Sequence, residues 1–433
     1  PRFLPLPYNS LLKLYNLIIV NLVKIISNKI ISKKAIVGIV GMGYVGNALA
    51  SLITDAGFNT LGFVRKEENA EKINKEKNKR LKATTDTKLL KSCDVILVCV
   101  QTPLHRNKAP NLHFLENAIV QVSKYLKKGQ LVIIESSVPL GTTRNIVLPI
   151  LQKSNLNVGK DFFLAYSPER VDPGNKEFGL KDIPKVVAGL DKNSKDLANM
   201  FYRKIVKKVV PVSSLETAEM VKLLENTFRL VNISMVNEMA DYTKSLRVDI
   251  WEVIKACSTK PFGFLAHYPG PGVGGDCIPV VPYYLLDDAK RRGINLRLIE
   301  RACKINDEQP RKVAKRALEI LNATKKQKKK YKVLLLGVSY KPDVSDTRES
   351  PALRIWDILK RRGISVSYHD PYVSRINGVA SKELSKKAIE QYDMIVIVVD
   401  HNSIKYNTLL GLKKPILDTR NVFKNKHPNV FHI

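Results

Sequence analysis

One cysteine closes a run of glycines and prolines. The segment YPGPGVGGDCIPVVP occupies residues 268–282, and Cys277 follows four Gly and two Pro within nine positions. This composition excludes a regular helix or strand, and glycine lets the backbone pass close to a ligand. The sequence therefore presents a thiol, the side chain of a strong nucleophile, from a shaped loop. The alternative is a tight turn between domains in which the cysteine is only a small apolar side chain.

A lysine and an asparagine lie one helical turn apart upstream of this loop. The stretch Ser213–Glu216 has the pattern of a capping box and predicts the start of a helix of some thirty residues. Lys222 and Asn226 share one face of that helix. A solvated surface face explains their spacing equally well, but a helix joining two α/β halves is better interpreted as the domain and dimer spine, with one face turned to a cleft. Apolar residues recur along it at Val221, Leu224, Phe228, Val231 and Met235.

A glycine turn near the start of the chain predicts a dinucleotide site. The apolar run 35–40 has strand length, and it meets Gly41-Met-Gly43-Tyr44-Val45-Gly46 before a helical pattern that ends at Gly57. In this order of strand, turn and helix, the amides of the helix N-terminus can hold a pyrophosphate. A carboxylate for the adenosine ribose is expected after the second strand, 59–64, but the sequence has Val64-Arg65 there.

Polar residues follow three further strands that we expect in the same half. Thr102 follows the apolar run 93–100, Ser137 follows 131–134, and Glu169 follows 162–166. Ligands of open parallel sheets bind where strands end, so these three side chains are candidates for the site. For Glu169 a plain surface turn is the alternative. Cys93 and Cys99 are expected in the core.

The C-terminal third predicts a second doubly wound half without a glycine fingerprint. Strands are expected at 331–336, 365–369, 394–399 and 415–417. Lys341 and Arg348 lie between the first of these strands and a helix capped by Ser350, and Arg420 follows the last strand. Between the halves, helical patterns cover 251–257 and resume after Pro282 until a break expected at 306–310. Cys257 and Cys303 fall in these helices and are expected to be packing residues.

Composition limits the possible partners and compartments. At 433 residues, with a net charge of +32, the chain is long enough for about three domains and favours an anionic ligand. The basic residues are scattered outside 325–332, and without a nucleic-acid motif we expect a nucleotide-type ligand and no nucleic acid. The five cysteines lack CxxC spacing, which favours a reducing cytoplasm and argues against disulfides and a metal site.

The first 33 residues contain an apolar stretch of the length of a long helix. The apolar stretch 11–31 is interrupted by Lys13, Asn16, Asn21 and Lys24, so it lacks the clean run of about 20 apolar residues that spans a membrane. We expect an amphipathic helix that packs on the protein. A helix on a membrane surface is the less favoured alternative.

Together these residues closely resemble the UDP-glucose/GDP-mannose dehydrogenase family. The most specific pieces are the GxGYVG turn, the loop ending at Cys277 and the run SDTRESP at 345–351. Within the family, KPFGF at 260–264 followed by YPGPG at 268–272 resembles the branch that oxidises UDP-N-acetylhexosamines. UDP-glucose 6-dehydrogenase, a catalytically impaired nucleotide-sugar-binding relative and a plain 2-hydroxy-acid dehydrogenase are the alternatives. The last explains neither the cysteine loop nor the second α/β half.

The resemblance implies an α/β fold of two doubly wound Rossmann-like domains, joined by a long central helix and a helical dimerisation region. It divides the chain into an N-terminal extension (1–33), an NAD(P)-binding domain (34–212), a central region carrying the cysteine loop (213–308) and a domain that binds the UDP-sugar (309–433). It also implies NAD as cofactor, a UDP-sugar substrate, a homodimer or higher homo-oligomer, and a cytoplasmic location.

The family's reaction is a four-electron oxidation of a sugar C6 alcohol to the acid. By resemblance, Lys222 and Asn226 stabilise the alkoxide, Cys277 attacks the aldehyde, and Glu169 positions or deprotonates the hydrolytic water. The residues implied as cofactor contacts are Gly41, Gly43, Tyr44, Val45, Gly46, Arg65, Thr102, Ser137 and Arg348. Those implied as substrate contacts are Glu169, Lys222, Asn226, Phe264, Tyr268, Gly274, Lys341 and Arg420.

Two positions depart from the family pattern. Many relatives carry an Asp four residues after the cysteine, where this chain has Val281. The second departure is Val64-Arg65, which removes a negative charge beside the ribose and adds a positive one. We therefore expect a weakened preference for NAD, with NADP accepted measurably.

Overall fold

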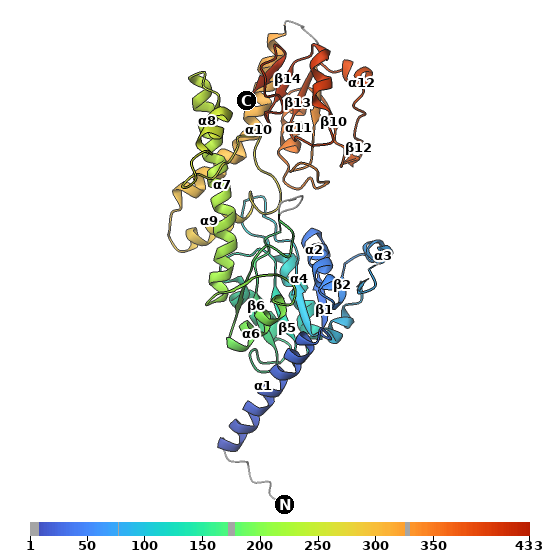
Figure 1. Ribbon diagram of the computed structural model, residues 1–433, viewed down its shortest axis with the longest axis vertical. Helices are drawn as coiled ribbons and strands as arrows, with labels where there is room; N and C mark the ends of the chain where they lie inside the picture. Colours follow the sequence, from blue (N-terminus) through green and yellow to red (C-terminus); the bar gives the residue numbers. More distant parts are fainter. Residues whose placement is uncertain (1–7, 77, 172–177, 325–329) are drawn as a thin grey trace, which may run out of the picture. The chain divides into compact units, whose positions relative to one another are not determined.

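The computed structural model describes residues 8–76, 78–171, 178–324 and 330–433, with side chains from residue 19 onward (Figure 1). Residues 325–329 of the basic cluster at 325–332 lie outside these residues. The chain forms two compact units, residues 1–224 and 225–433. Each unit is built around its own mainly parallel sheet.

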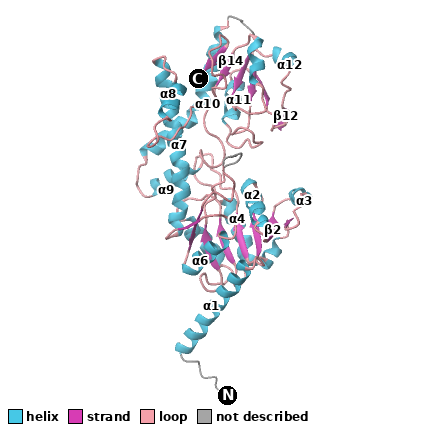
Figure 2. Ribbon diagram, in the orientation of Figure 1, coloured by secondary structure: helices cyan, strands magenta, loops and turns pink. Residues whose placement is uncertain are grey.

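The sheet of the first unit has eight strands in the order β3-β2-β1-β4-β5-β6-β7-β8 (Figure 2). All neighbours pair in parallel except β6 and β7. The order of the first six is that of a dinucleotide-binding fold, whose ligand crosses the sheet where the order reverses, here between β1 and β4. The strands are β1 Ile36–Val40, β2 Asn59–Phe63, β3 Leu81–Thr84, β4 Val95–Val98, β5 Leu131–Ile134, β6 Phe163–Tyr166, β7 Lys185–Gly189 and β8 Val209–Pro211.

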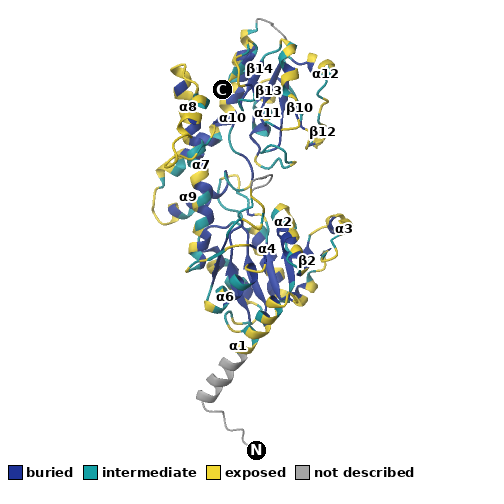
Figure 3. Ribbon diagram, in the orientation of Figure 1, coloured by how far each residue is buried: buried dark blue, intermediate teal, exposed yellow. Residues whose placement is uncertain are grey.

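Helices cover both faces of this sheet, because its central strands are apolar on both sides. Along β4, Val95 and Leu97 join one buried cluster, and Ile96 and Val98 join another. Figure 3 shows the strands as a continuous buried layer. The helices are α1 Tyr8–Ile31, α2 Tyr44–Asp55, α3 Glu67–Lys75, α4 His113–Tyr125, α5 Leu148–Gln152 and α6 Lys192–Tyr202.

The end of α1 belongs to the core of this unit. Ile26 and Ile30 are buried in the cluster formed with α2 and α6. Lys29 adds an ion pair, its Nζ lying 2.7 Å from Oδ1 of Asp94. The expected packing of this helix on the protein is therefore confirmed over its described side chains, and α1 contributes to the core ahead of β1.

The second unit contains a five-stranded parallel sheet in the order β10-β9-β13-β14-β15, with its order reversal between β9 and β13. Its strands are β9 Lys332–Leu336, β10 Ser365–His369, β13 Met394–Ile397, β14 Ile416–Asp418 and β15 Val430–His432, with a separate hairpin of β11 Arg375–Ile376 and β12 Val379–Ala380. Its helices are α8 Ile250–Cys257, α9 Val281–Arg291, α10 Arg297–Ala323, α11 Pro351–Arg361 and α12 Lys386–Glu390. Helix α7, Leu215–Ser245, begins in the first unit and continues into the second.

Three local predictions need correction. Helix α10 runs through Pro310 where a break was expected, because packing on both sides of the proline outweighs the one backbone hydrogen bond that it removes. The hydroxyl that caps α7 belongs to Ser214, which accepts from the amide of Thr217 at 3.1 Å, one residue later than predicted. Cys257 is exposed rather than packed, since α8 buries little besides Ile254 (Figure 3).

No helix in the part of the chain that the structure describes combines the length and the apolar character needed to cross a lipid bilayer.

Candidate active site

The glycine turn after β1 has the backbone that a dinucleotide requires. Gly41 has a φ of 99°, and a Cβ there would lie 2.7 Å from the carbonyl oxygen of Cys99. A Cβ on Gly46 would lie 2.1 Å from the carbonyl oxygen of Gly41, so only glycine lets α2 approach this closely. At Gly43, by contrast, no described atom lies within 4 Å of where a Cβ would be. The turn is tight where it packs and open where a pyrophosphate would lie, which fits NAD.

Thr102 and Ser137 meet at the ends of the neighbouring strands β4 and β5. The Thr102 hydroxyl donates to the carbonyl oxygen of Ser137 at 2.6 Å. Ser136 joins the same ends by donating to the carbonyl oxygen of Val100 at 2.8 Å. Thr102 and Ser137, the two predicted residues, are thus brought together at the edge where the cofactor of this fold binds.

Arg65 lies after β2, as predicted, and its guanidinium carbon is 5.2 Å from the centre of the Phe114 ring on α4. The two glutamates that follow have partners of their own. Glu67 accepts from the Thr85 hydroxyl at 2.6 Å, and Glu68 pairs with Lys66 at 3.1 Å. The positive charge of Arg65 therefore lies just after β2, where the usual dinucleotide-binding fold has a carboxylate.

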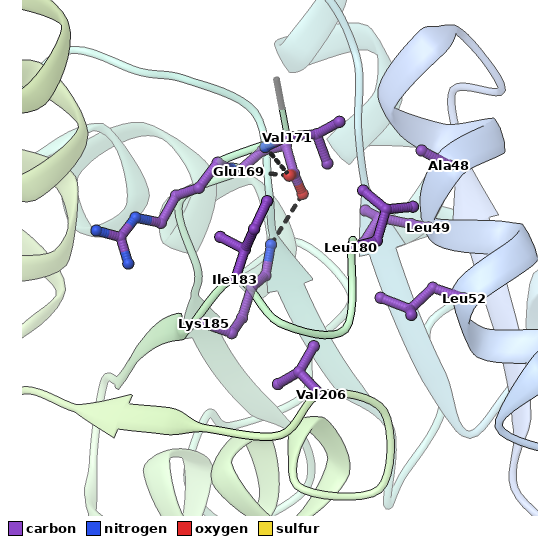
Figure 4. A pocket seen from close by; sticks show the side chains of 10 residues that line it. Ala48, Leu49, Leu52, Glu169, Val171, Leu180, Ile183, Lys185 and Val206 are labelled. Atoms are coloured by element: carbon purple, nitrogen blue, oxygen red, sulfur yellow. Dashed lines mark hydrogen bonds and ion pairs between the residues drawn. The ribbon is translucent and has the colours of Figure 1, made fainter. Parts of the chain in front are cut away.

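Glu169 lies in a buried charge cluster instead of a surface turn, so that alternative is wrong. Its Oε2 atom accepts from Nζ of Lys185 at 2.9 Å, and its Oε1 accepts from the amide of Val171 at 2.6 Å (Figure 4). Lys185 also donates to Glu135 at 2.5 Å, and Tyr202 donates to the same carboxylate. The predicted base is therefore held by a lysine that joins two carboxylates.

The cluster keeps Glu169 ionised. Burial on its own raises the pKa of Glu169, but the Lys185 ammonium, the Val171 amide and the charge of Lys222 outweigh burial and hold the pKa below its usual range. For Glu135, burial dominates and raises the pKa to about 7, in spite of Lys185. Glu169 is thus an anion at neutral pH, as a base or water-positioning group must be.

A small cavity adjoins the pair formed by Glu169 and Lys185. Its volume is about 20 Å³, which is room for about one water molecule. Figure 4 shows Leu49, Leu52 and Val206 lining its apolar side, and Lys185 pointing toward Glu169. A water here would lie against Glu169, the residue predicted to act on the hydrolytic water.

Lys222 and Asn226 are buried on one side of α7, with exposed fractions of 7% and 9%. The solvated face that explained their spacing equally well is therefore wrong. Glu219 holds this part of the helix: its carboxylate accepts from the amide of Gly141 at 2.5 Å and from the amide of Thr143 at 2.9 Å. The start of α7 is thereby fixed to the turn that follows Ser137. The charge of Lys222 also acts on Glu169, so these two predicted residues are close together.

In the second unit, two buried asparagines hold the cysteine loop. Asn237 on α7 accepts from the amide of Gly270 at 2.9 Å, and Asn306 on α10 accepts from the amide of Val273 at 2.7 Å. Cys277 itself is partly buried, and its carbonyl oxygen accepts from the amide of Val281 at 2.8 Å. The loop therefore has a defined shape, which supports a specific role for its thiol more than a plain connecting turn.

The loop also packs on the segment that follows β9. The amide of Gly275 donates to the carbonyl oxygen of Arg348 at 2.9 Å. A Cβ on Gly274 would lie 2.8 Å from Cβ of Tyr340, so a larger residue does not fit. Arg348 pairs with Asp276, the residue beside Cys277, and also with Asp346. The thiol and the predicted cofactor contact Arg348 thus belong to one local assembly.

Two other predicted ligand residues lie near this assembly. A Cβ on Gly270 would lie 2.9 Å from the guanidinium of Arg420, whose Nε donates to Asp400 at 2.8 Å. The segment carrying Lys341 is held from its start: the Asp370 carboxylate accepts from the amides of Val338 and Ser339 at 2.7 and 3.1 Å. Both cations therefore come from carboxyl-end loops of the second sheet, Lys341 after β9 at the order reversal and Arg420 after β14.

Phe264 and Tyr268 lie on the exposed part of the loop. Their exposed fractions are 37% and 50%, and the Tyr268 ring stacks on Trp251 with centroids 5.2 Å apart. The nearby Phe262 is 71% exposed, and Nζ of Lys260 lies 5.1 Å from the centre of its ring. This exposed apolar surface of the loop is available to a ligand or to another chain.

Three family models match the chain in this order: the NAD binding domain over residues 63–206, the central domain over 216–308 and the UDP binding domain over 334–425, all of the UDP-glucose/GDP-mannose dehydrogenase family. A UDP-N-acetyl-D-mannosamine dehydrogenase of Pyrococcus horikoshii is 34% identical over 90% of this chain and 96% of its own length.

The chain belongs to the UDP-glucose/GDP-mannose dehydrogenase family.

The chain is therefore an NAD-dependent nucleotide-sugar dehydrogenase, and the predicted family, fold and cofactor NAD are confirmed. The solved structure of the Pyrococcus horikoshii UDP-D-ManNAc dehydrogenase superposes with a TM-score of 0.83, covering 92% of this chain and 98% of that one at 34% identity. A UDP-N-acetyl-D-glucosamine 6-dehydrogenase of Pseudomonas aeruginosa is 33% identical over 85% of this chain and 91% of its own length.

Some residues of this dehydrogenase site were not predicted from the sequence. Lys185 begins the buried strand β7, and a lysine inside an apolar run is the one signal that it has a buried partner. Asn237 and Asn306 gave no such signal, because each looks like one more polar residue of a long helix. Their role appears only when the loop is folded against α7 and α10.

Proposed function

We propose that this enzyme oxidises the C6 alcohol of a UDP-N-acetylhexosamine to the uronic acid. The relatives named above act on the gluco and manno forms of this sugar. The observation that carries the proposal is the cysteine loop, which is packed against Arg348 and Arg420 of the domain that binds UDP in this family. A thiol held there would reach the sugar end of a UDP-sugar.

The proposed reaction has two oxidation steps and one hydrolysis. Lys222 and Asn226 stabilise the alkoxide while the C6 hydride leaves, which gives the aldehyde. The Cys277 thiolate adds to that aldehyde carbon, and loss of a second hydride from the thiohemiacetal leaves a thioester. Water activated by Glu169 then cleaves the thioester and restores the thiol. NAD, when bound, accepts one hydride in each oxidation.

The remaining site residues are proposed as contacts. Lys341 and Arg420 hold the diphosphate and uridine, and Phe264, Tyr268 and Gly274 line the substrate side of the loop. The turn Gly41–Gly46, with Tyr44 and Val45, holds the pyrophosphate of NAD. Arg65, Thr102, Ser137 and Arg348 are the other proposed cofactor contacts. These assignments are supported by the residue type at each position and by the local geometry described above.

A panel of substrates tests the proposal directly. Purified enzyme and NAD are incubated separately with UDP-GlcNAc, UDP-ManNAc, UDP-glucose and GDP-mannose. NADH formation is followed by absorbance, and the mass of each product is measured by mass spectrometry. We expect two NADH and one uronic acid for each molecule of an N-acetylhexosamine substrate. Faster turnover of UDP-glucose would favour the alternative, a UDP-glucose 6-dehydrogenase. Binding of UDP-sugars without NADH formation would favour a catalytically impaired relative. The structural reason to consider that alternative is Val281, which is fully buried at the position where many relatives carry Asp.

A homodimer formed along α7 is also proposed. Leu224, Phe228, Met235 and Tyr242 are each more than half exposed, and Met239 is 42% exposed. Their spacing of four, seven, four and three residues puts all five on one narrow stripe of the helix. An exposed apolar stripe of this length is typical of a surface that a second chain covers. A cytoplasmic location is likewise proposed, supported by five free thiols.

A further inference from the structure

A cavity in the second unit gathers unpaired hydrogen-bond donors. It lies between the second half of α7 and the middle of α10, helices labelled in Figure 1, and its volume is about 170 Å³. Within the described part of the chain, five buried side-chain atoms have no hydrogen-bond partner, and three of them are nitrogens: Nδ2 of Asn237, Nε2 of Gln309 and Nε of Arg316. All three residues line this cavity. A buried donor without a partner destabilises the fold, so three at one place call for an acceptor.

The charges around the cavity point to the kind of acceptor. Its two side-chain carboxylates already have partners, since Asp241 pairs with Lys312, and Glu319 pairs with Arg316 at 3.2 Å. Lys244 and Lys315 add two further positive charges to the lining. Burial and the neighbouring charge of Arg316 lower the pKa of Lys244, as expected where cations are crowded. A ligand that accepts hydrogen bonds and carries negative charge would pair the free donors and offset the crowded positive charges.

The amide orientation of Asn237 is fixed by the cysteine loop. Its Oδ1 accepts from the amide of Gly270, so its Nδ2 is necessarily the donor left for the cavity. Gln309 lies behind the same loop, where its Cβ is 3.4 Å from the position of a Cβ on Gly272. Both residues are buried, with exposed fractions of 3% and 4%. A group bound in the cavity would therefore be one side chain away from the loop that ends at Cys277.

We infer that this cavity is a binding site for a small phosphate-bearing anion, separate from the proposed NAD and UDP-sugar sites, and that its occupation holds the cysteine loop in place. A phosphate group offers several acceptor oxygens to the three amide and guanidinium donors. It also supplies negative charge between Lys244 and Lys315. The cavity is several times larger than the space that a single water needs.

Titration of the full-length enzyme with inorganic phosphate tests this inference. Saturating UDP and NAD are present throughout to occupy the active site, and ionic strength is held constant with KCl. We expect calorimetry to show one phosphate bound for each chain. Gln309→Leu and Lys244→Met should each weaken binding about tenfold, the equivalent of one charge-assisted hydrogen bond. Lys290→Met, at an exposed lysine on α9 outside the cavity, should leave binding unchanged.

Amide hydrogen exchange provides a second measurement, and it does not depend on activity. Phosphate should slow exchange at Gly270 and in the rest of the loop in the wild type but not in Gln309→Leu. The inference is overturned if no phosphate binds in the presence of UDP and NAD, or if both variants bind it as the wild type does. Loop exchange in the wild type that is equally fast with and without phosphate would show that the cavity holds only water.

Discussion

Lys185 is placed between two carboxylates that have opposite pKa behaviour. Glu135 is fully enclosed and burial raises its pKa to about 7, whereas Glu169 at the edge of the cluster is kept ionised. One ammonium therefore pairs with two carboxylates, and it keeps the carboxylate of Glu169 ionised. The charge state of the proposed base depends on a residue that does not itself contact the substrate in the proposed mechanism.

Replacing Lys185 by Met tests this arrangement. Without the ammonium, burial dominates at Glu169, so its pKa rises and the acid limb of the kcat/KM profile should move up by at least about one pH unit. Leaving two buried carboxylates unpaired should also cost about 3–5 kcal/mol of unfolding free energy. Lys192→Met is the matched control, because its ion pair with Asp196 is exposed to solvent and should contribute little to stability. A stable variant with an unchanged pH profile would contradict the positioning role.

Replacing Cys277 by Ser should abolish formation of the acid while sparing the binding of NAD and UDP-sugar. A hydroxyl without a partner base is a poor nucleophile at neutral pH, so the product should stop at the aldehyde or its hydrate. Mass spectrometry identifies the product, and calorimetry measures the binding of NAD and UDP-sugar. Cys257→Ser, at an exposed cysteine of α8, should behave like the wild type. Acid formed at a near wild-type rate by Cys277→Ser would exclude a covalent intermediate.

The cofactor preference should follow from the residues after β2. Arg65 keeps its positive charge near the ribose position, and Glu67 and Glu68 are occupied with Thr85 and Lys66. NADP should therefore be accepted measurably, and Val64→Asp should restore a strong preference for NAD by repelling the 2′-phosphate. The ratio of kcat/KM for the two cofactors in both proteins measures this. A wild type that rejects NADP by several orders of magnitude would show that these charges do not reach the ribose.

At the scale of elements, α7 is fixed at its start by one buried acid. Glu219 accepts from the Gly141 and Thr143 amides and from the Thr143 hydroxyl, and burial raises its pKa to about 7. Its ordinary pKa of 4.5 applies in the unfolded chain. The folded protein therefore binds the proton more tightly than the unfolded chain between these two pH values. Stability should decrease as pH rises through this window.

The size of this effect can be measured against Glu219→Gln. Relative to that variant, the unfolding free energy of the wild type should fall by about 3 kcal/mol between pH 4.5 and 7, at about 1.4 kcal/mol for each pH unit. Glu216→Gln is a control of opposite sign: a hydrogen bond from Arg144 lowers the pKa of Glu216, so its stabilisation is present above pH 4.5 and is lost as pH falls. Urea titrations at several pH values give both curves. Parallel curves for wild type and Glu219→Gln would contradict the buried-acid assignment.

The elements themselves were largely predictable from local pattern. Apolar runs bounded by Gly, Pro and polar residues located strands such as β5 and β10 at their observed limits. The order of glycine turn, strand ends and cysteine loop located the candidate site. Prediction failed where tertiary packing outweighs local preference: Pro310 stays helical, and Asn237 holds a loop that is 33 residues away in sequence. No local signal carries that information, because the partner comes from another element.

At the scale of the whole molecule, the α7 stripe should determine the oligomeric state. Phe228→Glu combined with Met235→Glu places two charges in the proposed dimer contact, so the dimer dissociation constant should rise at least about thirtyfold. Light scattering after size-exclusion chromatography measures the mass. Leu298→Glu, at a residue of α10 that is 70% exposed and outside the stripe, should leave the mass unchanged. A wild type that is monomeric at every concentration would refute the dimer.

The uneven exposure of the five thiols has a practical consequence for chemical labelling. Cys257 is exposed and Cys99 and Cys277 are partly exposed, whereas Cys93 and Cys303 are buried. An alkylating reagent added to the folded enzyme therefore meets Cys257 first, and a bulk count of incorporated label says little about the proposed nucleophile. In a background with both Cys257→Ser and Cys99→Ser, a mass tag or fluorophore would instead report on Cys277, and slow labelling of Cys93 and Cys303 would mark unfolded molecules. The same reagent would then measure substrate protection and structural integrity in a single experiment.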